Sequence, residues 1–451
     1  MGMITLRQAA AWCGGTVEEK YADTTFLGAC NDTRVLKPGQ LFVALRGDRD
    51  GHEFIPDAMK KGAAAVLCKR RMGDYPAIYV SDPRLALGEI ARRERMRIGM
   101  KVVGITGSVG KSTTKEMVAK VLETTFRTAK TPANHNNDIG VPMAILDMPE
   151  DTQVAVVEMG MNHFREMAYL SRIARPDVAA IINVGTMHIE HLGFIEGVRK
   201  AKLEILEGMS DSGVLLLNGD DVMLRNLEHQ PKQSILYFGS DEGCFIRVSD
   251  VVQDEQLHFT VHGQDLEFPV SVNVEGTHYV GDALAAVAVG LTLNVSPENI
   301  RVGLSSFHNI AGRQEVLQVG GMTIIKDCYN AGPESMEAAL RVLGGKPGRK
   351  VAVLGDMLEL GTCTQAEHYR IGRIAAEKAD LVFAYGPNSG RIISGCLTGG
   401  MKDAAAKAYT DKEKITSALR YALKPGDFVL VKGSRGMHME QILDSLLQSE
   451  N

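Results

Sequence analysis

The stretch from Val102 to Thr114 constrains the fold of this chain more than any other. A β-branched run leads into a small-residue loop that ends in Gly110-Lys111-Ser112, and apolar residues then recur at helical spacing. This order predicts a strand, a loop and a helix. In such a unit the glycines turn backbone N–H groups inward and the helix N-terminus adds partial positive charge, which suits a polyphosphate. Lys111 is expected to reach the outer phosphates and the Ser112 hydroxyl to bind Mg²⁺.

The loop misses the common phosphate-loop pattern G-x-x-x-x-G-K-[ST] by one position. The position five before Gly110 is Ile105, and Gly104 lies one residue further back. An ordinary glycine-rich turn is the alternative interpretation, but a Gly-Lys-Ser-Thr-Thr run between a strand and a helix favours phosphate binding. The expected nucleotide-loop residues are Thr106, Gly107, Ser108, Val109, Gly110, Lys111, Ser112 and Thr113.

Length and composition narrow the class of protein. A chain of 451 residues predicts two to four domains, and a net charge of −5 argues against a nucleic-acid-binding surface. The seven cysteines contain no close pair, so neither a disulfide framework nor a zinc site is expected. No apolar run reaches membrane-spanning length, and we therefore expect a cytoplasmic protein without a transmembrane segment.

Alternating apolar strands and helical segments predict three α/β domains. The first, residues 1–97, is small; the second, 98–312, is a central P-loop domain with a parallel sheet; the third, 313–451, is Rossmann-like. Residues 244–274 predict an antiparallel excursion before a helix at 282–292. The expected strands are 41–45, 64–67, 77–80, 102–106, 154–158, 178–183, 214–218, 322–325, 351–354, 381–385 and 428–431.

Polar residues end each expected strand of the central domain, where ligands of parallel sheets bind. Glu158 follows a strand that should lie beside the P-loop strand, where its carboxylate would complete Mg²⁺ coordination with Ser112. A helix-capping role is the alternative for Glu158. By themselves, His188 has the character of a structural histidine and Lys202 that of a surface helix lysine.

The segment from Thr131 to Pro142 is rich in amide side chains. Amides donate and accept hydrogen bonds without net charge, which suits a sugar or peptide substrate. An Asn-rich turn with local backbone bonding is the alternative.

These features together resemble the Mur ligases, and the resemblance covers nearly all 451 residues. The short P-loop matches that family's own loop, and the other matching motifs are spread along the chain. They are Asp32-Thr33-Arg34, Asn134 to Pro142, Glu158-Met159-Gly160, Asp327 to Ala331, Gly355 to Gly361, and Lys432-Gly433-Ser434-Arg435.

The resemblance implies an ATP-dependent amide ligase of peptidoglycan precursor synthesis. It would join D-alanyl-D-alanine to UDP-N-acetylmuramoyl-tripeptide through an acyl phosphate, with release of ADP and phosphate. Ser112 and Glu158 would hold one Mg²⁺, while His188 and a carbamylated Lys202 would hold a second. A carbamate is an anionic oxygen ligand, whereas an ammonium would repel the metal. The implied catalytic residues are Lys111, Glu158, His188 and Lys202.

Binding roles follow from the same resemblance. ATP would contact His278, Asp282, Arg313 and Asp327 besides the loop. The N-terminal domain would hold the UDP-sugar and the C-terminal domain the dipeptide, through Thr33, Arg34, Gly47, Asn134, Asn136, Asn137, Tyr329, Asn330 and Ser434.

This sequence departs from the usual family pattern at four positions, Tyr279, Asp282, Lys326 and Gly332. A sister ligase with another donor or acceptor is one rival function, and a nucleotide-binding paralogue without ligase activity is another. We expect a monomer that does not bind nucleic acid.

Overall fold

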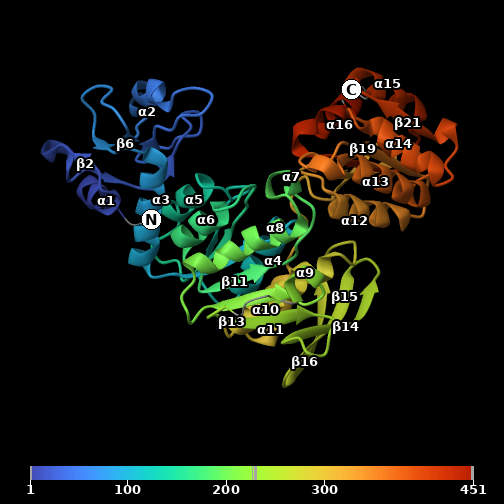
Figure 1. The fold of residues 1–451 in the computed structure, drawn as a ribbon, viewed down its shortest axis with the longest axis horizontal. Helices are drawn as coiled ribbons and strands as arrows, with labels where there is room; N and C mark the ends of the chain where they lie inside the picture. Colours follow the sequence, from blue (N-terminus) through green and yellow to red (C-terminus); the bar gives the residue numbers. More distant parts are fainter. Residues whose placement is uncertain (1–2, 226, 228–230, 448–451) are drawn as a thin grey trace.

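The computed structural model describes residues 3–225, 227 and 231–447, and it contains three α/β units (Figure 1). Figure 1 shows the N-terminal unit in blue and the C-terminal unit in red on opposite sides of the green-to-yellow central unit. Each unit is built on its own sheet, of five, nine and six strands in chain order, and a separate two-stranded ribbon pairs β1 (Ile4–Thr5) with β3 (Thr25–Phe26). The three predicted α/β units are therefore confirmed.

The N-terminal sheet has the order β2-β7-β6-β5-β4. Its strands are β2 (Thr16–Val17), β4 (Ala29–Cys30), β5 (Leu41–Val43), β6 (Ala65–Cys68) and β7 (Ala77–Tyr79), and its helices are α1 (Leu6–Cys13), α2 (Ile55–Lys60) and α3 (Pro83–Ile98). Apolar residues of α3, such as Leu87 and Ile90, belong to the same buried cluster as Val102 of the central unit. The first two units therefore share a continuous core through α3.

The central sheet has the order β16-β15-β14-β13-β12-β11-β8-β10-β9. Its strands are β8 (Lys101–Thr106), β9 (Thr128–Lys130), β10 (Val154–Glu158), β11 (Val178–Ile181), β12 (Val214–Asn218), β13 (Ser234–Gly239), β14 (Ile246–Gln253), β15 (Leu257–Gly263) and β16 (Leu266–Val272). Strands β9 to β14 run parallel, and β15 and β16 form the predicted antiparallel excursion. Because β8 lies between β10 and β11, the P-loop is flanked by the ends of both neighbours.

Helices cover both faces of the central sheet because alternate residues of its strands point to opposite sides. Val102 packs in a core with α5 (Gly140–Leu146), α6 (Glu166–Ala174) and α8 (Ile195–Leu203). The next residue, Val103, packs in a second core with α4 (Lys111–Glu123), α10 (Tyr279–Thr292) and α11 (Pro297–Ser305). The short helices α7 (Ile189–Leu192) and α9 (Val222–Arg225) follow β11 and β12.

The C-terminal sheet has the order β17-β18-β22-β19-β20-β21, and only β17 is antiparallel. Its strands are β17 (Glu315–Val319), β18 (Met322–Asp327), β19 (Lys350–Gly355), β20 (Leu381–Tyr385), β21 (Ala406–Tyr409) and β22 (Phe428–Lys432). One core contains residues of α12 (Pro333–Gly344), α13 (Thr364–Lys378) and α14 (Ser389–Thr398), and the other those of α15 (Lys412–Ala422) and α16 (Met439–Leu447). Within the described ranges, no helix combines the length and apolar character that a membrane span requires.

Candidate functional site

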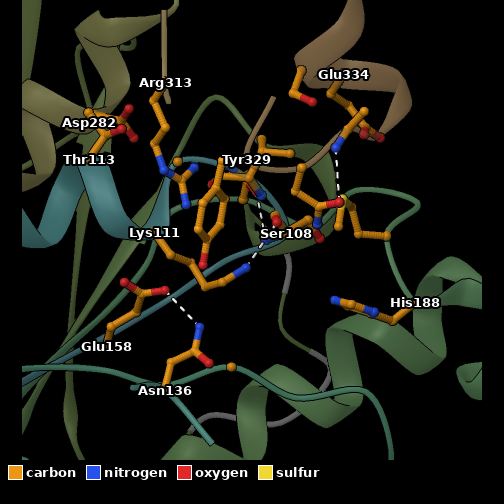
Figure 2. Close-up of a pocket in the computed structure, with 18 of the residues that line it drawn as sticks. Ser108, Lys111, Thr113, Asn136, Glu158, His188, Asp282, Arg313, Tyr329 and Glu334 are labelled. Atoms are coloured by element: carbon orange, nitrogen blue, oxygen red, sulfur yellow. Dashed lines mark hydrogen bonds between the residues drawn. The ribbon is translucent and has the colours of Figure 1, made fainter. Parts of the chain in front are cut away.

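A pocket of about 630 Å³ opens between the carboxyl ends of the central strands and the first elements of the C-terminal unit (Figure 2). This volume lies in the usual range for a small-molecule site. Residues of the P-loop, the Asn-rich segment, β10 and the start of α10 form one wall, and residues 327–338 with Lys432 form the other. From the predicted site, the pocket-lining residues are Ser108, Val109, Gly110, Lys111, Thr113, Asn136, Asn137, Glu158, His188, His278, Asp282, Arg313, Asp327, Tyr329 and Asn330.

The lysine of the P-loop lies over its own loop. The Lys111 Nζ donates to the carbonyl oxygens of Gly107 (2.8 Å) and Ser108 (3.0 Å). Burial lowers the pKa of the Lys111 ammonium to about 8. Phosphate oxygens would be stronger, charged acceptors than these two neutral carbonyls. Gly110 turns the chain into α4 with φ 83°, a conformation that favours glycine.

Asn183, at the end of β11, holds the P-loop in place. Its Oδ1 accepts hydrogen bonds from the backbone N–H groups of Ser108 (2.8 Å) and Val109 (3.0 Å), and its Nδ2 donates to the Val109 carbonyl (3.0 Å). The Gly185 N–H donates to the Ser108 hydroxyl at 2.8 Å. These contacts rigidify the loop, and the first N–H groups of α4 are left to bind phosphate. The sequence placed Asn183 at a strand end but did not indicate this role.

Glu158 ends β10 directly beside the P-loop strand, as predicted. Its Oε1 accepts from the Asn136 amide at 2.9 Å, whereas its buried Oε2 has no hydrogen-bond partner among the described residues. The buried Lys115 Nζ lies 3.7 Å from Oε2 and also donates to the carbonyls of Thr131 and Ala133. Because Glu158 belongs to a strand, the helix-cap interpretation is wrong. Lys115 is a site residue that helical spacing alone did not reveal.

The residues at this wall fit a Mg²⁺ ion. The Glu158 Oε2 has no hydrogen bond and only the Lys115 ammonium at 3.7 Å, so it can still bind a cation. The Ser112 hydroxyl, which receives a hydrogen bond from Arg313 Nη2 at 2.9 Å, supplies a second oxygen. No cluster of three His, Cys, Asp or Glu side chains able to hold a metal occurs in the described part of the chain. Mg²⁺ commonly uses only one or two carboxylates with substrate phosphates and water, so this donor set suffices.

His188 is held by the C-terminal unit. Its backbone has φ 64°, and its Nδ1 lies 2.5 Å from Glu359 Oε2, which leaves Nε2 free to bind a ligand. Figure 2 shows His188 across the pocket from Glu158.

Lys202 is buried rather than a surface lysine, with 2% of the residue exposed. Burial and the nearby Lys111 lower its pKa well below the usual value, and its Nζ makes no hydrogen bond to the described residues. Burial therefore favours the neutral amine of Lys202 over its ammonium form. The surface-helix interpretation of Lys202 is therefore wrong.

Asp282 packs on the P-loop helix. Its Oδ1 accepts from the Thr114 hydroxyl at 2.7 Å, and a Cβ placed on Gly110 would lie 2.5 Å from the same oxygen. Burial raises the pKa of Asp282 to about 7. Asp282 lies inside α10, which begins at Tyr279 with His278 as its N-cap residue.

The opposite wall carries an aromatic ring and a buried ion pair. The Arg313 guanidinium lies 4.2 Å from the Tyr329 ring centroid, a cation–π distance. Asp327 is paired with Lys432 at 2.6 Å, and Lys432 also donates to the Asn330 carbonyl. Lys432, which belongs to the Lys432-Gly433-Ser434-Arg435 motif, lines the pocket, although the motif alone did not indicate a role for it.

Several expected substrate residues do not line this pocket. Thr33, Arg34 and Gly47 lie on the N-terminal unit, and Asn134 is exposed outside the pocket. Ser434 is buried and ties loops together, since its hydroxyl donates to the Ala331 carbonyl and accepts from the Leu358 N–H.

Asn137 both lines the pocket and makes local bonds. Its Oδ1 accepts from the N–H groups of Ile139 (3.2 Å) and Gly140 (2.7 Å) at the start of α5. Local backbone bonding, the alternative raised for this Asn-rich segment, is therefore real at Asn137. The Asn136 amide instead points at Glu158.

Two family profiles match the two units that form the pocket. The profile described as Mur ligase middle domain matches residues 105–290, and the profile described as Mur ligase, glutamate ligase domain matches residues 312–435. Both matches contain the pocket walls described above.

Full-length relatives share this organisation. The chain is 39% identical over 456 residues to the UDP-N-acetylmuramoyl-tripeptide–D-alanyl-D-alanine ligase of Bacillus subtilis, covering 99% of this chain and 98% of that one. The structure is similar to MurF from Acinetobacter baumannii, with a TM-score of 0.91, 32% identity and 99% of both chains covered. It is also similar to the MurF ligase from Thermotoga maritima in complex with ADP, with a TM-score of 0.82, 29% identity, and 94% and 99% coverage.

Proposed function

The chain belongs to the Mur ligase family, and we propose that it joins D-alanyl-D-alanine to UDP-N-acetylmuramoyl-tripeptide at the expense of ATP. It is an ATP-dependent ligase of peptidoglycan precursor synthesis. The observation that carries the proposal is one pocket with two walls. A P-loop lysine and a carboxylate with an unpaired oxygen stand on the central wall, and the glutamate-ligase-type unit forms the other.

In the first step, a carboxylate of the tripeptide attacks the γ-phosphate of ATP, which yields an acyl phosphate and ADP. Lys111 would leave the carbonyls of Gly107 and Ser108 and donate to the transferring phosphoryl group. Negative charge grows on those oxygens in the transition state, so a preorganised ammonium lowers the barrier. Asn183 keeps the loop in position while Lys111 moves.

In the second step, the amine of D-alanyl-D-alanine attacks the acyl carbon and phosphate leaves. The amine must approach from the C-terminal wall, because the central wall is occupied by the nucleotide loop. Tyr329 and Asn330 stand on that wall, and we propose that they contact the dipeptide.

Mg²⁺ would be held by Ser112 and Glu158, and it would neutralise charge on the phosphates. Asn136 and Lys115 orient Glu158 by fixing one oxygen and balancing the charge of the other. Arg313, which donates to Ser112, is placed to contact the phosphates.

We further propose that Lys202 is carbamylated and contributes with His188 to a second Mg²⁺ site. Burial favours the neutral form of the Lys202 amine, and a neutral amine is the form that reacts with CO₂. The Lys202 nitrogen forms a bond to the carbon of CO₂ and loses a proton to solvent, and the product is a carbamate anion. The negative charge of the carbamate would also attract the nearby Lys111 ammonium, which a protonated Lys202 would repel.

The UDP-sugar would bind the N-terminal unit at Thr33, Arg34 and Gly47. These residues do not line the pocket, so the units must close around the substrates for the reaction. We propose residues 1–97, 98–312 and 313–451 as the three functional domains, a monomeric enzyme and a cytoplasmic location.

The test is a panel of UDP-muramoyl peptides and dipeptides assayed for phosphate release. If the proposal is correct, phosphate is released only when ATP, the tripeptide nucleotide and D-alanyl-D-alanine are all present. Release with a different amine would identify a sister ligase, and no donor-dependent release would identify a nucleotide-binding paralogue.

A further inference from the structure

Glu334 lies on the C-terminal wall of the pocket, at the second position of α12 (Figure 2). Its Oε1 reaches across to the central unit and accepts from the Thr186 N–H (3.0 Å) and the Thr186 hydroxyl (3.2 Å). A Cβ placed on Gly185 would lie only 2.6 Å from this oxygen, so the approach is close. One oxygen of Glu334 is thus fixed by two donors from the opposite wall.

The other oxygen of Glu334 is buried and has no hydrogen-bond partner within the described ranges. Burial of an unpaired carboxylate oxygen is costly, and the cost is removed when a cation or a strong donor binds. Asp327, the other acidic side chain on this wall, is already paired with Lys432. Glu334 therefore carries the uncompensated negative charge of the C-terminal wall.

We propose that Glu334 Oε2 binds the ammonium of the amino donor and then accepts its proton. The inference rests on the proposed function, in which a dipeptide amine is a substrate of this wall. An α-amino group titrates near pH 8, so much of it arrives as an ammonium at neutral pH and cannot attack. A carboxylate there both attracts the cation and orients its nitrogen toward the acyl phosphate.

The ammonium gives one proton to Glu334 Oε2, and the freed nitrogen lone pair forms the bond to the acyl carbon. The bond between that carbon and the phosphate oxygen breaks with its electron pair, and phosphate leaves. The second proton lost from nitrogen when the amide forms passes to the departing phosphate or to water.

Glu334→Gln is the discriminating variant because it keeps an oxygen for Thr186 and replaces the free carboxylate oxygen by an amide nitrogen. We expect the KM for D-alanyl-D-alanine to rise roughly 10- to 100-fold, the range for loss of a charge-assisted hydrogen bond, with the KM for ATP and for the tripeptide nucleotide within about twofold of wild type. Raising the pH above about 8 should narrow the deficit, because the donor is then already a neutral amine.

The matched control is Glu337→Gln on the same helix. Glu337 is paired with Arg341 and Arg370 and does not line the pocket, so all three KM values should stay at the wild-type level. Thr186→Val removes one donor to Oε1 but leaves Oε2 unchanged. If Glu334 served only to join the units, Thr186→Val would reproduce the defect of Glu334→Gln, and that result would overturn the inference.

Trapping the acyl phosphate with hydroxylamine separates this inference from the proposed function. Hydroxylamine is largely neutral at neutral pH, so Glu334→Gln should still form the hydroxamate in the presence of ATP and the tripeptide nucleotide. Wild-type protein that forms neither hydroxamate nor ligated product would refute the proposed function. The role of Glu334 would be refuted if the wild-type protein forms both the hydroxamate and the ligated product while Glu334→Gln leaves the KM for D-alanyl-D-alanine unchanged. It would also be refuted if the variant raises the Mg²⁺ requirement and not this KM. Circular dichroism of each variant verifies that it is folded.

Discussion

Asp282→Asn should make the protein more stable at alkaline pH. Asp282 is 9% exposed, and burial raises the pKa of its carboxyl to about 7 from 3.8. The unfolded chain therefore loses this proton near pH 4, whereas the folded protein retains it until about pH 7. Folding takes up a proton between these values, so the free energy of unfolding falls as the pH rises from about 4 to 7 and is then level.

The size of the effect follows from the two pKa values. At 1.36 kcal/mol per pKa unit, the interval from 3.8 to about 7 corresponds to at most about 4 kcal/mol. Asparagine carries no charge and keeps an oxygen to accept from Thr114, so it removes this cost without losing the hydrogen bond. Local relaxation of the structure reduces this value. We therefore expect Asp282→Asn to raise the free energy of unfolding by about 2 kcal/mol at pH 8 and to leave it unchanged near pH 4.

Scanning calorimetry of both proteins from pH 4 to 8 would measure the difference. For a unit of 150–250 residues, about 2 kcal/mol raises Tm by roughly 4–8 °C. The exposed turn residue Asp265 supplies the control Asp265→Asn, which should leave Tm unchanged. A gain for Asp282→Asn that persists at pH 4, or a loss at pH 8, would refute the assignment of the raised pKa to a buried carboxyl.

Further outcomes concern the nucleotide site. If Asp282 faces the nucleotide, Asp282→Asn should raise the affinity for ATP about two- to tenfold at pH 8, and by less at pH 6. Titration calorimetry at constant Mg²⁺ would measure the affinities of both proteins. Equal affinities would place the adenine contact at another residue, for example His278. Lys111→Ala should lower kcat on the order of 10²–10³ with the fold intact, and an active variant would remove the P-loop assignment. Lys202→Ala should lose most activity and regain part of it with short carboxylates, whereas full activity, or an unmodified amine in a metal-loaded crystal structure, would contradict the carbamate. Asn183→Ala should raise the KM for ATP by freeing the N–H groups of residues 108 and 109, and an unchanged KM would show that the clamp is dispensable.

The central strands of the sheets could be predicted because a strand that is buried on both faces consists of a continuous run of apolar residues. The expected strands 154–158, 214–218 and 381–385 match β10, β12 and β20 at both ends. Strands β1 to β4, β9, β13, β17 and β21 were not among the expected strands. β9 and β21 lie at sheet edges, and the Thr128–Lys130 and Ala406–Tyr409 segments contain lysines and few large apolar residues. β13 lies inside the central sheet, but polar residues border its short apolar run.

The central wall of the site was also predictable, since local order along the chain determines it. A P-loop must start α4, and a carboxylate that ends the next parallel strand must lie at the same edge of the sheet, so Glu158 was placed correctly. Residue type alone misjudged Lys202 because burial depends on packing with distant elements. The spacing of apolar residues around Lys202 does not show that its own side chain points inward.

The contacts that join the two walls could not be read from the sequence. Glu334 contacts Thr186, which is 148 positions away in the sequence, and Glu359 contacts His188, which is 171 positions away. Both partners belong to the segment from Asn183 to His188, whose first residue clamps the P-loop. One short loop therefore contacts the P-loop at its start and the C-terminal unit at its end. Because each contact is a single polar pair on an irregular segment, it leaves no periodic signal, and only the folded structure reveals that both walls depend on the same loop.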